Sequence, residues 1–152
     1  MSRMLPSGEH TLRVMRESDL DAVLMIEQAS FSSPWKRDHF IHEITAPHST
    51  PLVAECSGSI AGYLCLTALF EEAQILDIAV LPEQRGRGVA RLLLEYAFSL
   101  AREKGAEFVS LEVRETNEAA LYLYERLGFL RTGRRARYYE ATDDAVLMEK
   151  IL

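Results

Sequence analysis

Hydrophobic residues recur along this chain at two spacings, one typical of helices and the other of strands. Spacings of three and four predict four helices, over 19–30, 34–46, 88–104 and 118–127. Alternating or continuous hydrophobic runs predict seven strands, over 10–16, 51–56, 60–70, 73–80, 108–113, 129–139 and 145–152. The strands meander first and then alternate with helices, which predicts an α/β (mixed α+β) fold. We expect a largely antiparallel, twisted sheet of about seven strands with helices on both faces.

Residues that favour helix ends stand at most of these boundaries. Ser18 is suited to cap the first helix, and Ser33 the second, with Pro34 at its first helical position. Asn117 is suited to cap the fourth helix. Gly105 follows the third helix, where glycine commonly ends a helix. These residues therefore predict where each helix begins or ends.

Composition and charge narrow the classes of protein. The chain has 152 residues, 48% of them hydrophobic, and a net charge of −6. We expect one domain over residues 1–152 with a sizeable core. The acidic balance argues against binding nucleic acid through charge, which needs a basic face. No run fits a signal peptide or a membrane span, so we expect a cytoplasmic protein.

Cysteines and histidines add two expectations. Cys56 and Cys65 stand alone inside predicted strands, without CxxC spacing. We expect free thiols in a reducing compartment, not a disulfide framework. The four histidines lack the spacing of metal ligands, so we expect no metal.

One segment joins a strand, a glycine-rich loop and the start of a helix. The strand ends before Pro82, and the loop holds Gly86 and Gly88. Backbone N–H groups at the start of a helix bind anions, and glycine lets a phosphate approach the backbone. Each such bond to a charged oxygen is worth roughly 1.5–3 kcal/mol. We predict a phosphate or pyrophosphate site here, the alternative being a flexible turn with solvated arginines.

The loop is neither a Walker motif, which ends in Gly-Lys-Ser/Thr, nor a GxGxxG dinucleotide fingerprint. Its pattern Arg85-x-x-Gly88-x-Ala90 resembles motif A of the GNAT acetyltransferases, with Ala90 where glycine is frequent. The resemblance covers nearly the whole chain, and further motifs look like the RimI branch of that family. They are Ser33-Pro34-Trp35, Leu111-Glu112-Val113-Arg114, Asn117-x-x-Ala120, Leu123-Tyr124-Glu125-x-x-Gly128-Phe129 and Arg137-Tyr138-Tyr139.

The resemblance implies acetyl-CoA as co-substrate. By position, the backbone of Ile78, Ala79 and Val80 is expected to pair with the pantetheine arm like an added strand. Asn117 is expected near the thiol end of that arm, besides capping its helix. The pyrophosphate is expected on the amides of Gly86, Arg87, Gly88, Val89, Ala90 and Arg91.

Acetyl transfer to an amine requires that the amine lose a proton, and the departing thiolate is stabilised by gaining one. Glu112 is the candidate base; a solvated ion pair with Arg114, on the same strand face, is the alternative. Tyr124 is the candidate acid, because helical spacing points it inward while Tyr122 points elsewhere. A plain core tyrosine is the alternative. The resemblance places a catalytic glutamate and a catalytic tyrosine at these two positions.

The substrate side is less sharply marked. By resemblance Trp35 walls an acceptor groove, or else it closes the core beneath the helices. Tyr138 and Tyr139 are further candidates, and strand alternation sends one of them inward. Glu71, Glu72 and Asp77 would add negative potential for a basic peptide, although the two glutamates are better explained as solvated charges. The arginines between residues 131 and 137 are expected to be solvated, the alternatives being contact with ribosomal RNA or with the 3′-phosphate of CoA.

The resemblance implies a protein N-terminal acetyltransferase in which the amine attacks acetyl-CoA directly. The RimI branch acetylates the N-terminal alanine of the eighteenth small-subunit ribosomal protein, which is therefore the expected partner. We expect no direct contact with nucleic acid or membrane, and a monomer or weak dimer. Two alternatives stay open: a GNAT enzyme acting on a lysine side chain or small polyamine, and a non-catalytic acyl-CoA-binding module. The presence of both Glu112 and Tyr124 speaks against the second.

Overall fold

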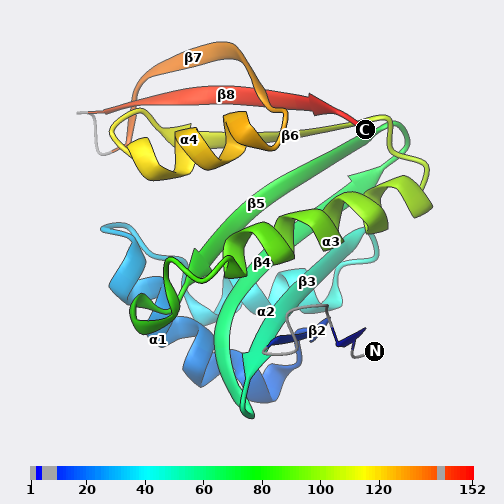
Figure 1. Cartoon of the computed structure of the whole chain (residues 1–152), viewed down its shortest axis with the longest axis vertical. Coiled ribbons are helices and arrows are strands. Elements are labelled where there is room, and N and C mark those ends of the chain that lie inside the picture. Colours follow the sequence, from blue (N-terminus) through cyan, green and yellow to red (C-terminus); the bar gives the residue numbers. More distant parts are fainter. Residues whose placement is uncertain (1–2, 5–9, 140–142) are drawn as a thin grey trace. The chain divides into compact units, whose positions relative to one another are not determined.

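The computed structural model describes residues 3–4, 10–139 and 143–152 (Figure 1). The chain forms two compact units, one of Met1–Thr67 with Asp77–Ala97, the other of Ala68–Leu76 with Phe98–Leu152. The strands are β1 (Arg3–Met4), β2 (His10–Val14), β3 (Ser49–Cys56), β4 (Ser59–Leu69), β5 (Glu72–Val80), β6 (Phe108–Arg114), β7 (Leu130–Tyr139) and β8 (Asp143–Ile151). The helices are α1 (Leu20–Ser30), α2 (Arg37–Thr45), α3 (Val89–Glu103) and α4 (Glu118–Arg126), with 3₁₀ turns η1 (Glu17–Asp19) and η2 (Pro82–Gln84).

All seven predicted strands and all four predicted helices form, in the predicted order. The mixed α/β fold with a mostly antiparallel sheet is therefore confirmed. The two-residue strand β1, which pairs with β2, is an addition that the sequence pattern did not predict. Asn117 caps α4 as expected, its Oδ1 accepting the backbone N–H of Ala120 at 3.2 Å.

In the first unit the strands follow the order β1-β2-β3-β4-β5, and the first four pair antiparallel. The β3–β4 hairpin turns at Ser57 and Gly58, whose φ angles are +52° and +81°. Two successive positive φ angles suit a tight hairpin turn. The middle of β4, residues 61–66, is buried without alternation, which indicates that both faces of the strand are covered.

Helices cover those two faces (Figure 1). On one face, α1 and α2 share a hydrophobic core with Val53 of β3 and with Tyr63 and Cys65 of β4. The Phe40 ring of α2 meets the Tyr63 ring edge-on at 5.6 Å. On the other, α3 begins against Gly62. A Cβ at Gly62 would lie 2.9 Å from the Ala79 carbonyl oxygen and 3.2 Å from Val89 Cγ1. Glycine is therefore required for β5 and α3 to approach β4 this closely.

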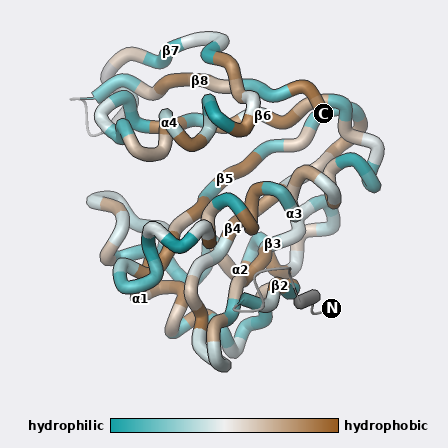
Figure 2. Tube along the Cα trace, in the orientation of Figure 1, coloured by the Kyte–Doolittle hydropathy of each residue, from teal (hydrophilic) through white to brown (hydrophobic). Residues whose placement is uncertain are grey.

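The helix α3 shows the alternation from which it was predicted. Figure 2 shows hydrophobic and hydrophilic residues succeeding one another along it. Val89, Leu93, Leu94 and Ala97 are buried, at spacings of three and four that form one helical stripe. The helix ends before Gly105, whose φ of +90° continues no helix. The burial of this stripe fixes the rotation of α3.

In the second unit the strand order is β5-β6-β8-β7. β5 and β6 pair in parallel over Glu72–Gln74, while β6, β8 and β7 pair antiparallel. The final hairpin is thus turned so that β8 lies beside β6 and β7 forms the edge. Beneath it, the Phe129 ring lies 5.7 Å from the Tyr124 ring and 5.8 Å from the Phe98 ring. These aromatic contacts join α4 and the end of α3 to the hairpin.

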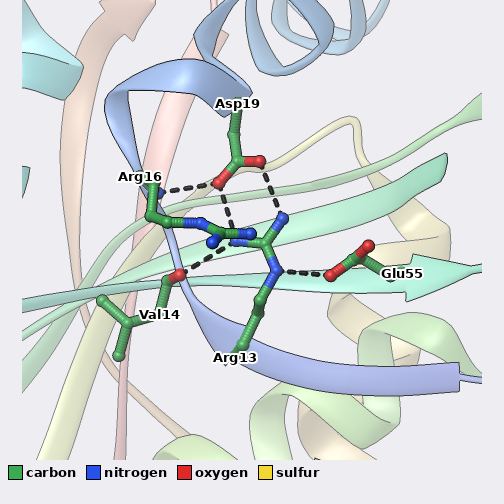
Figure 3. Close-up of polar contacts among 5 residues, drawn as sticks. All are labelled: Arg13, Val14, Arg16, Asp19 and Glu55. Atoms are coloured by element: carbon green, nitrogen blue, oxygen red, sulfur yellow. Dashed lines mark hydrogen bonds and ion pairs between the residues drawn. The ribbon is translucent and has the colours of Figure 1, made fainter. Parts of the chain in front are cut away.

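Arg13 on β2 is a buried cation held by two carboxyl groups (Figure 3). Its Nη1 and Nη2 donate to Asp19 Oδ2 and Oδ1, each at 2.8 Å, and its Nε donates to Glu55. Asp19 Oδ2 also accepts the backbone N–H of Arg16 at 2.7 Å. The hydrogen bond from Arg13 holds the pKa of Asp19 below its ordinary value. The network ties β2, η1 and β3 together.

The first helix begins within one residue of the predicted start, but it lacks the predicted serine cap. α1 begins at Leu20, and Ser18 lies inside the turn η1 instead of capping the helix. The carboxylate of Asp19 receives the Arg16 N–H at this turn, a bond that competes with a serine cap. The Arg13 pair therefore decides the helix start, and it joins residues that a local pattern does not connect.

The second helix also starts later than predicted, at Arg37 instead of Pro34. The backbone N–H of Trp35 donates to Glu27 Oε2 at 2.8 Å, and this bond holds the segment in a non-helical path. At the observed start, the backbone N–H of Lys36 donates to the His39 ring at 3.0 Å. This boundary is therefore set by a contact with α1, which the capping residues of the local sequence do not reveal.

Both cysteines are free thiols, as expected. Cys65 is buried in the core between β4 and the helices, and this burial raises the pKa of its thiol. Over the residues that the structure describes, no helix is long and hydrophobic enough to cross a membrane.

Replacing Asp19 by Asn should lower the free energy of unfolding at pH 7 by about 3 kcal/mol, because Arg13 loses a buried partner charge. The folded pKa of Asp19 is depressed, so its stabilisation is present above the unfolded pKa of about 3.9 and is lost as pH falls below it. Denaturant unfolding at pH 7 and at pH 3 measures this. Asp21→Asn, at an exposed ion pair, is the control; equal losses in both variants would contradict the role given to Asp19.

Gly62→Ala should lower the free energy of unfolding by about 1–3 kcal/mol, the usual range for overpacking. The added methyl group meets a backbone oxygen that cannot turn aside. At Gly133, by contrast, an added Cβ meets only the side chain of Leu147. Thermal unfolding of Gly62→Ala and of the control Gly133→Ala measures the difference. An unchanged melting temperature for Gly62→Ala would show that this approach is not tight.

Candidate functional site

The end of β5 is an edge strand of the first unit. The backbone N–H of Leu81 donates to the Ala61 carbonyl at 2.8 Å, and the Ala79 carbonyl faces Gly62, so both point toward β4. Because backbone groups alternate along a strand, those of Ile78 and Val80 point away from β4. An exposed strand edge of this kind pairs with extended ligands. Of the three predicted residues, Ile78 and Val80 face the free side.

The loop after β5 offers room for an anion. Gly86 and Gly88 have φ angles of +78° and +81°, a region that side chains disfavour. A Cβ built at either glycine meets no atom within 4 Å, so the loop is open on that side. The helix α3 begins at Val89, and its first amides have no carbonyl one turn earlier to bond. Open space and free donors at a helix N-terminus fit a diphosphate group.

Arg85 has a different role from that of a solvated loop arginine. Its Nε donates to the Val80 carbonyl at 3.0 Å, and its Nη2 donates to Ser30 Oγ at 3.1 Å. The side chain therefore joins the loop to the ends of β5 and α1. Arg91 also has a partner, its Nε lying 2.5 Å from Glu95 Oε1 one turn later on α3.

Trp35 lies at the edge of the helical core of the first unit. Its ring stacks on His39 at 5.6 Å and tilts against Phe40 at 5.1 Å, and it stays partly exposed. Its backbone N–H is held by the buried carboxyl of Glu27. The residue thus closes the core on one side and presents ring surface to solvent on the other.

Glu112 projects from β6 in the second unit, with its side chain 22% exposed. Its Oε1 lies 2.8 Å from Nη2 of Arg135 on β7. The expected alternative, an ion pair with Arg114, is wrong: Arg114 Nη1 donates to Asp143 Oδ2 at 2.8 Å. The hairpin brings Arg135 to this position, and the spacing within β6 alone does not reveal it.

Tyr124 and Asn117 also belong to the second unit. Tyr124 is 6% exposed on the inner face of α4, whereas Tyr122 is 62% exposed, as the helical spacing predicted. Asn117 stands at the N-terminus of α4. The second unit therefore holds Glu112, Tyr124 and Asn117, while the predicted pyrophosphate loop belongs to the first.

The remaining candidates lie on β7. Tyr138 is 49% exposed and has Arg135 Cζ 4.9 Å above its ring. The side chain of Tyr139 lies outside the described residues. Arg131 and Arg134 are about half exposed, and each pairs with carboxylates. Throughout the described residues, no three His, Cys, Asp or Glu side chains are grouped to hold a metal ion.

Sequence reasoning missed the buried carboxyls. Glu27 lies at the end of the stripe formed by positions 20, 23 and 24 of the first helix, so a glutamate there was a signal of a buried polar group. Asp77 was expected to supply negative potential, and this is wrong. It is 9% exposed, and burial with Glu27 beside it raises its pKa to about 10, so it is uncharged at neutral pH.

Comparison with known proteins places this geometry in a family. The profile of the Acetyltransferase (GNAT) family matches residues 20–129. A relative from Bacillus subtilis (strain 168) is 41% identical over 139 residues, 90% of this chain and 92% of the relative. The ribosomal protein bS18-alanine N-acetyltransferase of Escherichia coli (strain K12) is 32% identical over 142 residues, 91% of this chain and 95% of that enzyme.

Structural comparison agrees. The crystal structure of the ribosomal-protein-S18-alanine N-acetyltransferase from Escherichia coli superposes with a TM-score of 0.87 at 30% identity, covering 93% of each chain. The edge strand, the glycine loop and the helix start described above lie within the matched residues. The chain therefore belongs to the GNAT family and is an acetyl-CoA-dependent N-acetyltransferase.

Proposed function

We propose that this chain, acting over residues 1–152 as one catalytic domain, acetylates the N-terminal alanine of ribosomal protein bS18. The observation that carries the proposal is its likeness, over most of both chains, to the Escherichia coli enzyme with that activity. The side chains proposed for the chemistry, Glu112 and Tyr124, are both present and lie in one unit.

Two features of the first unit support acetyl-CoA binding. The amides from Gly86 to Arg91 are proposed to hold the pyrophosphate, because the loop is open and precedes a helix. The outward carbonyl of Ile78 and the outward N–H of Val80 are proposed to pair with the pantetheine arm, since the Val80 carbonyl already accepts a bond from Arg85. Asn117 is proposed to contact that arm near its thiol end.

When bound, acetyl-CoA supplies the acetyl group as a thioester. Glu112 is proposed to take the proton that the amine loses, through a water molecule, and Arg135 orients its carboxylate. Tyr124 is proposed to donate a proton to the departing thiolate. An α-amine has a pKa near 7.7–8.0 and a lysine side chain about 10.4, so lysine needs roughly 3.4 kcal/mol more to deprotonate. An α-amine therefore demands less of the partly buried Glu112 carboxylate than a lysine side chain does.

The acceptor side is proposed to use Trp35, Tyr138 and Tyr139. Trp35 presents ring surface beside the end of α1, and Tyr138 is half exposed. Aromatic rings of this kind offer apolar contact area with little loss of conformational entropy.

Peptides with the N-terminal sequence of bS18 should be acetylated by the purified protein, and a matched peptide with a blocked N-terminus should not. Mass spectrometry after incubation with acetyl-CoA locates the added group. Transfer to an internal lysine or to spermidine with none to the α-amine would favour the other acceptor classes. Binding of acetyl-CoA without transfer to any acceptor would indicate a binding module.

Glu112→Gln and Tyr124→Phe should each lower kcat by about 10²–10⁴, the range typical of general base and acid groups. Affinity for acetyl-CoA, measured by calorimetry, should change little in either variant. Tyr122→Phe, on the exposed face of the same helix, is the matched control and should retain full turnover. Near wild-type turnover in both test variants would remove Glu112 and Tyr124 from the chemistry.

A further inference from the structure

A buried acidic cluster lies beneath the Trp35 segment in the first unit. Glu27, on α1, is 2% exposed. Its Oε2 accepts the backbone N–H of Trp35 at 2.8 Å, and its Oε1 accepts the hydroxyl of Tyr63. Asp77, on β5, lies against the same carboxyl and is 9% exposed. Two carboxyl groups thus meet where water has little access.

Two buried carboxyls in contact would repel each other if both were charged, and a proton on one of them removes this repulsion. Asp77 accepts a backbone bond from Ile78, but no described group donates to its Oδ2. A deprotonated carboxyl has only acceptor oxygens, so Asp77 and Glu27 bond to each other only when one carries a proton. Both oxygens of Glu27 already accept hydrogen bonds from protein donors, whereas Asp77 Oδ2 has no partner among the described residues. The proton therefore belongs on Asp77.

Among the described residues, four other titratable side chains surround the cluster. Tyr63 and Cys65 face it from β4, and burial raises the pKa of both, so both stay neutral. Glu43 approaches Cys65 from α2 and is buried. His39, also on α2, stacks on the outer face of Trp35. Burial, and the Glu27 carboxyl, raise the pKa of Asp77 to about 10.

We propose that Asp77 is a positioning residue for the acceptor: its carboxylic proton bonds to Glu27, and Glu27 in turn holds the Trp35 segment. The inference rests on the proposed function, in which Trp35 walls the acceptor groove. Because Asp77 also accepts the Ile78 N–H, a single chain of hydrogen bonds connects the Trp35 segment with the strand edge proposed for pantetheine. The proton between Asp77 and Glu27 thus helps to position the segment that binds the acceptor.

The location of the proton is tested first, without any assay of activity. Protein with ¹³C-labelled aspartate carboxyls is titrated by NMR, and the Asp77 signal is assigned as the one absent from Asp77→Asn. It should remain at the protonated position through neutral pH, whereas exposed aspartates titrate near 3.9. Titration of Asp77 near that ordinary value would overturn the proposal.

Stability gives a second readout of the same proton. A folded pKa raised above the unfolded value means that the folded state holds a proton which the unfolded state releases. The wild type should therefore lose stability relative to Asp77→Asn as pH rises from about 4 to about 10, by up to about tenfold in the folding constant per pH unit. Glu103→Gln, at an exposed site, is the control. Identical pH slopes for wild type and Asp77→Asn would contradict the assignment.

The positioning role is tested by kinetics. Asp77→Asn keeps a neutral donor toward Glu27 and an acceptor for Ile78, so its KM for the acceptor peptide should stay within about twofold of wild type. Asp77→Leu has neither group, and its KM should rise about tenfold or more, with a smaller change in kcat. Calorimetry with acetyl-CoA checks that both variants are folded. Equal KM values for the Asn and Leu variants would overturn the role.

The two proposals fail in different ways. If no acceptor peptide is acetylated by the wild type, the proposed function fails, while the NMR titration still decides where the proton lies. If peptides are acetylated and Asp77 titrates as an ordinary aspartate, the positioning role fails and the proposed function stands.

Discussion

The absence of a side chain at Gly62 is the constraint on which the ligand-binding part of the first unit depends. A Cβ at Gly62 would lie only 2.9 Å from the Ala79 carbonyl oxygen and 3.2 Å from the Val89 side chain. One belongs to the end of β5 and the other to the first residue of α3, so both ends of the glycine loop rest on β4. The loop is also held by the Leu81–Ala61 backbone hydrogen bond and by the Arg85 side chain, which bonds to the Val80 carbonyl. A loop fixed in this way presents its amides with little loss of entropy on binding.

Buried charges and acids form the second layer of organisation in the first unit. Arg13 with Asp19 and Glu55 joins two strands and a helical turn, and its charges are balanced by direct partners (Figure 3). Glu27 with Asp77 is a different case, because two acids meet and a proton must balance them. In both, an unpaired polar group would be expensive, so the surrounding backbone has little freedom to move. The start of α1 and the path of the Trp35 segment follow from these pairs.

Much of the candidate site was predictable because it depends on local signals. The Ile78–Arg91 stretch shows a strand, two glycines and an amphipathic helix in direct succession, and Asn117 is a cap followed by a helical pattern. The inward direction of Tyr124 follows from helical spacing. The partners of the charged side chains were not predictable. Arg135 reaches Glu112 because the hairpin turns β7 back along β8, and Arg85 bonds to Ser30, which is 55 residues away in the sequence.

Periodicity and turn residues thus fixed the kind and order of the elements, since both act within a few residues of the chain. Packing decided where α1 and α2 begin, which strand of the last hairpin lies inside, and which carboxyls are buried. The reason is the size of the two effects. A helix cap favours a given helix start by about 1 kcal/mol, whereas leaving a buried charge without its partner costs several times more. Where the two conflict, as at Ser18 and Pro34, the distant partner prevails.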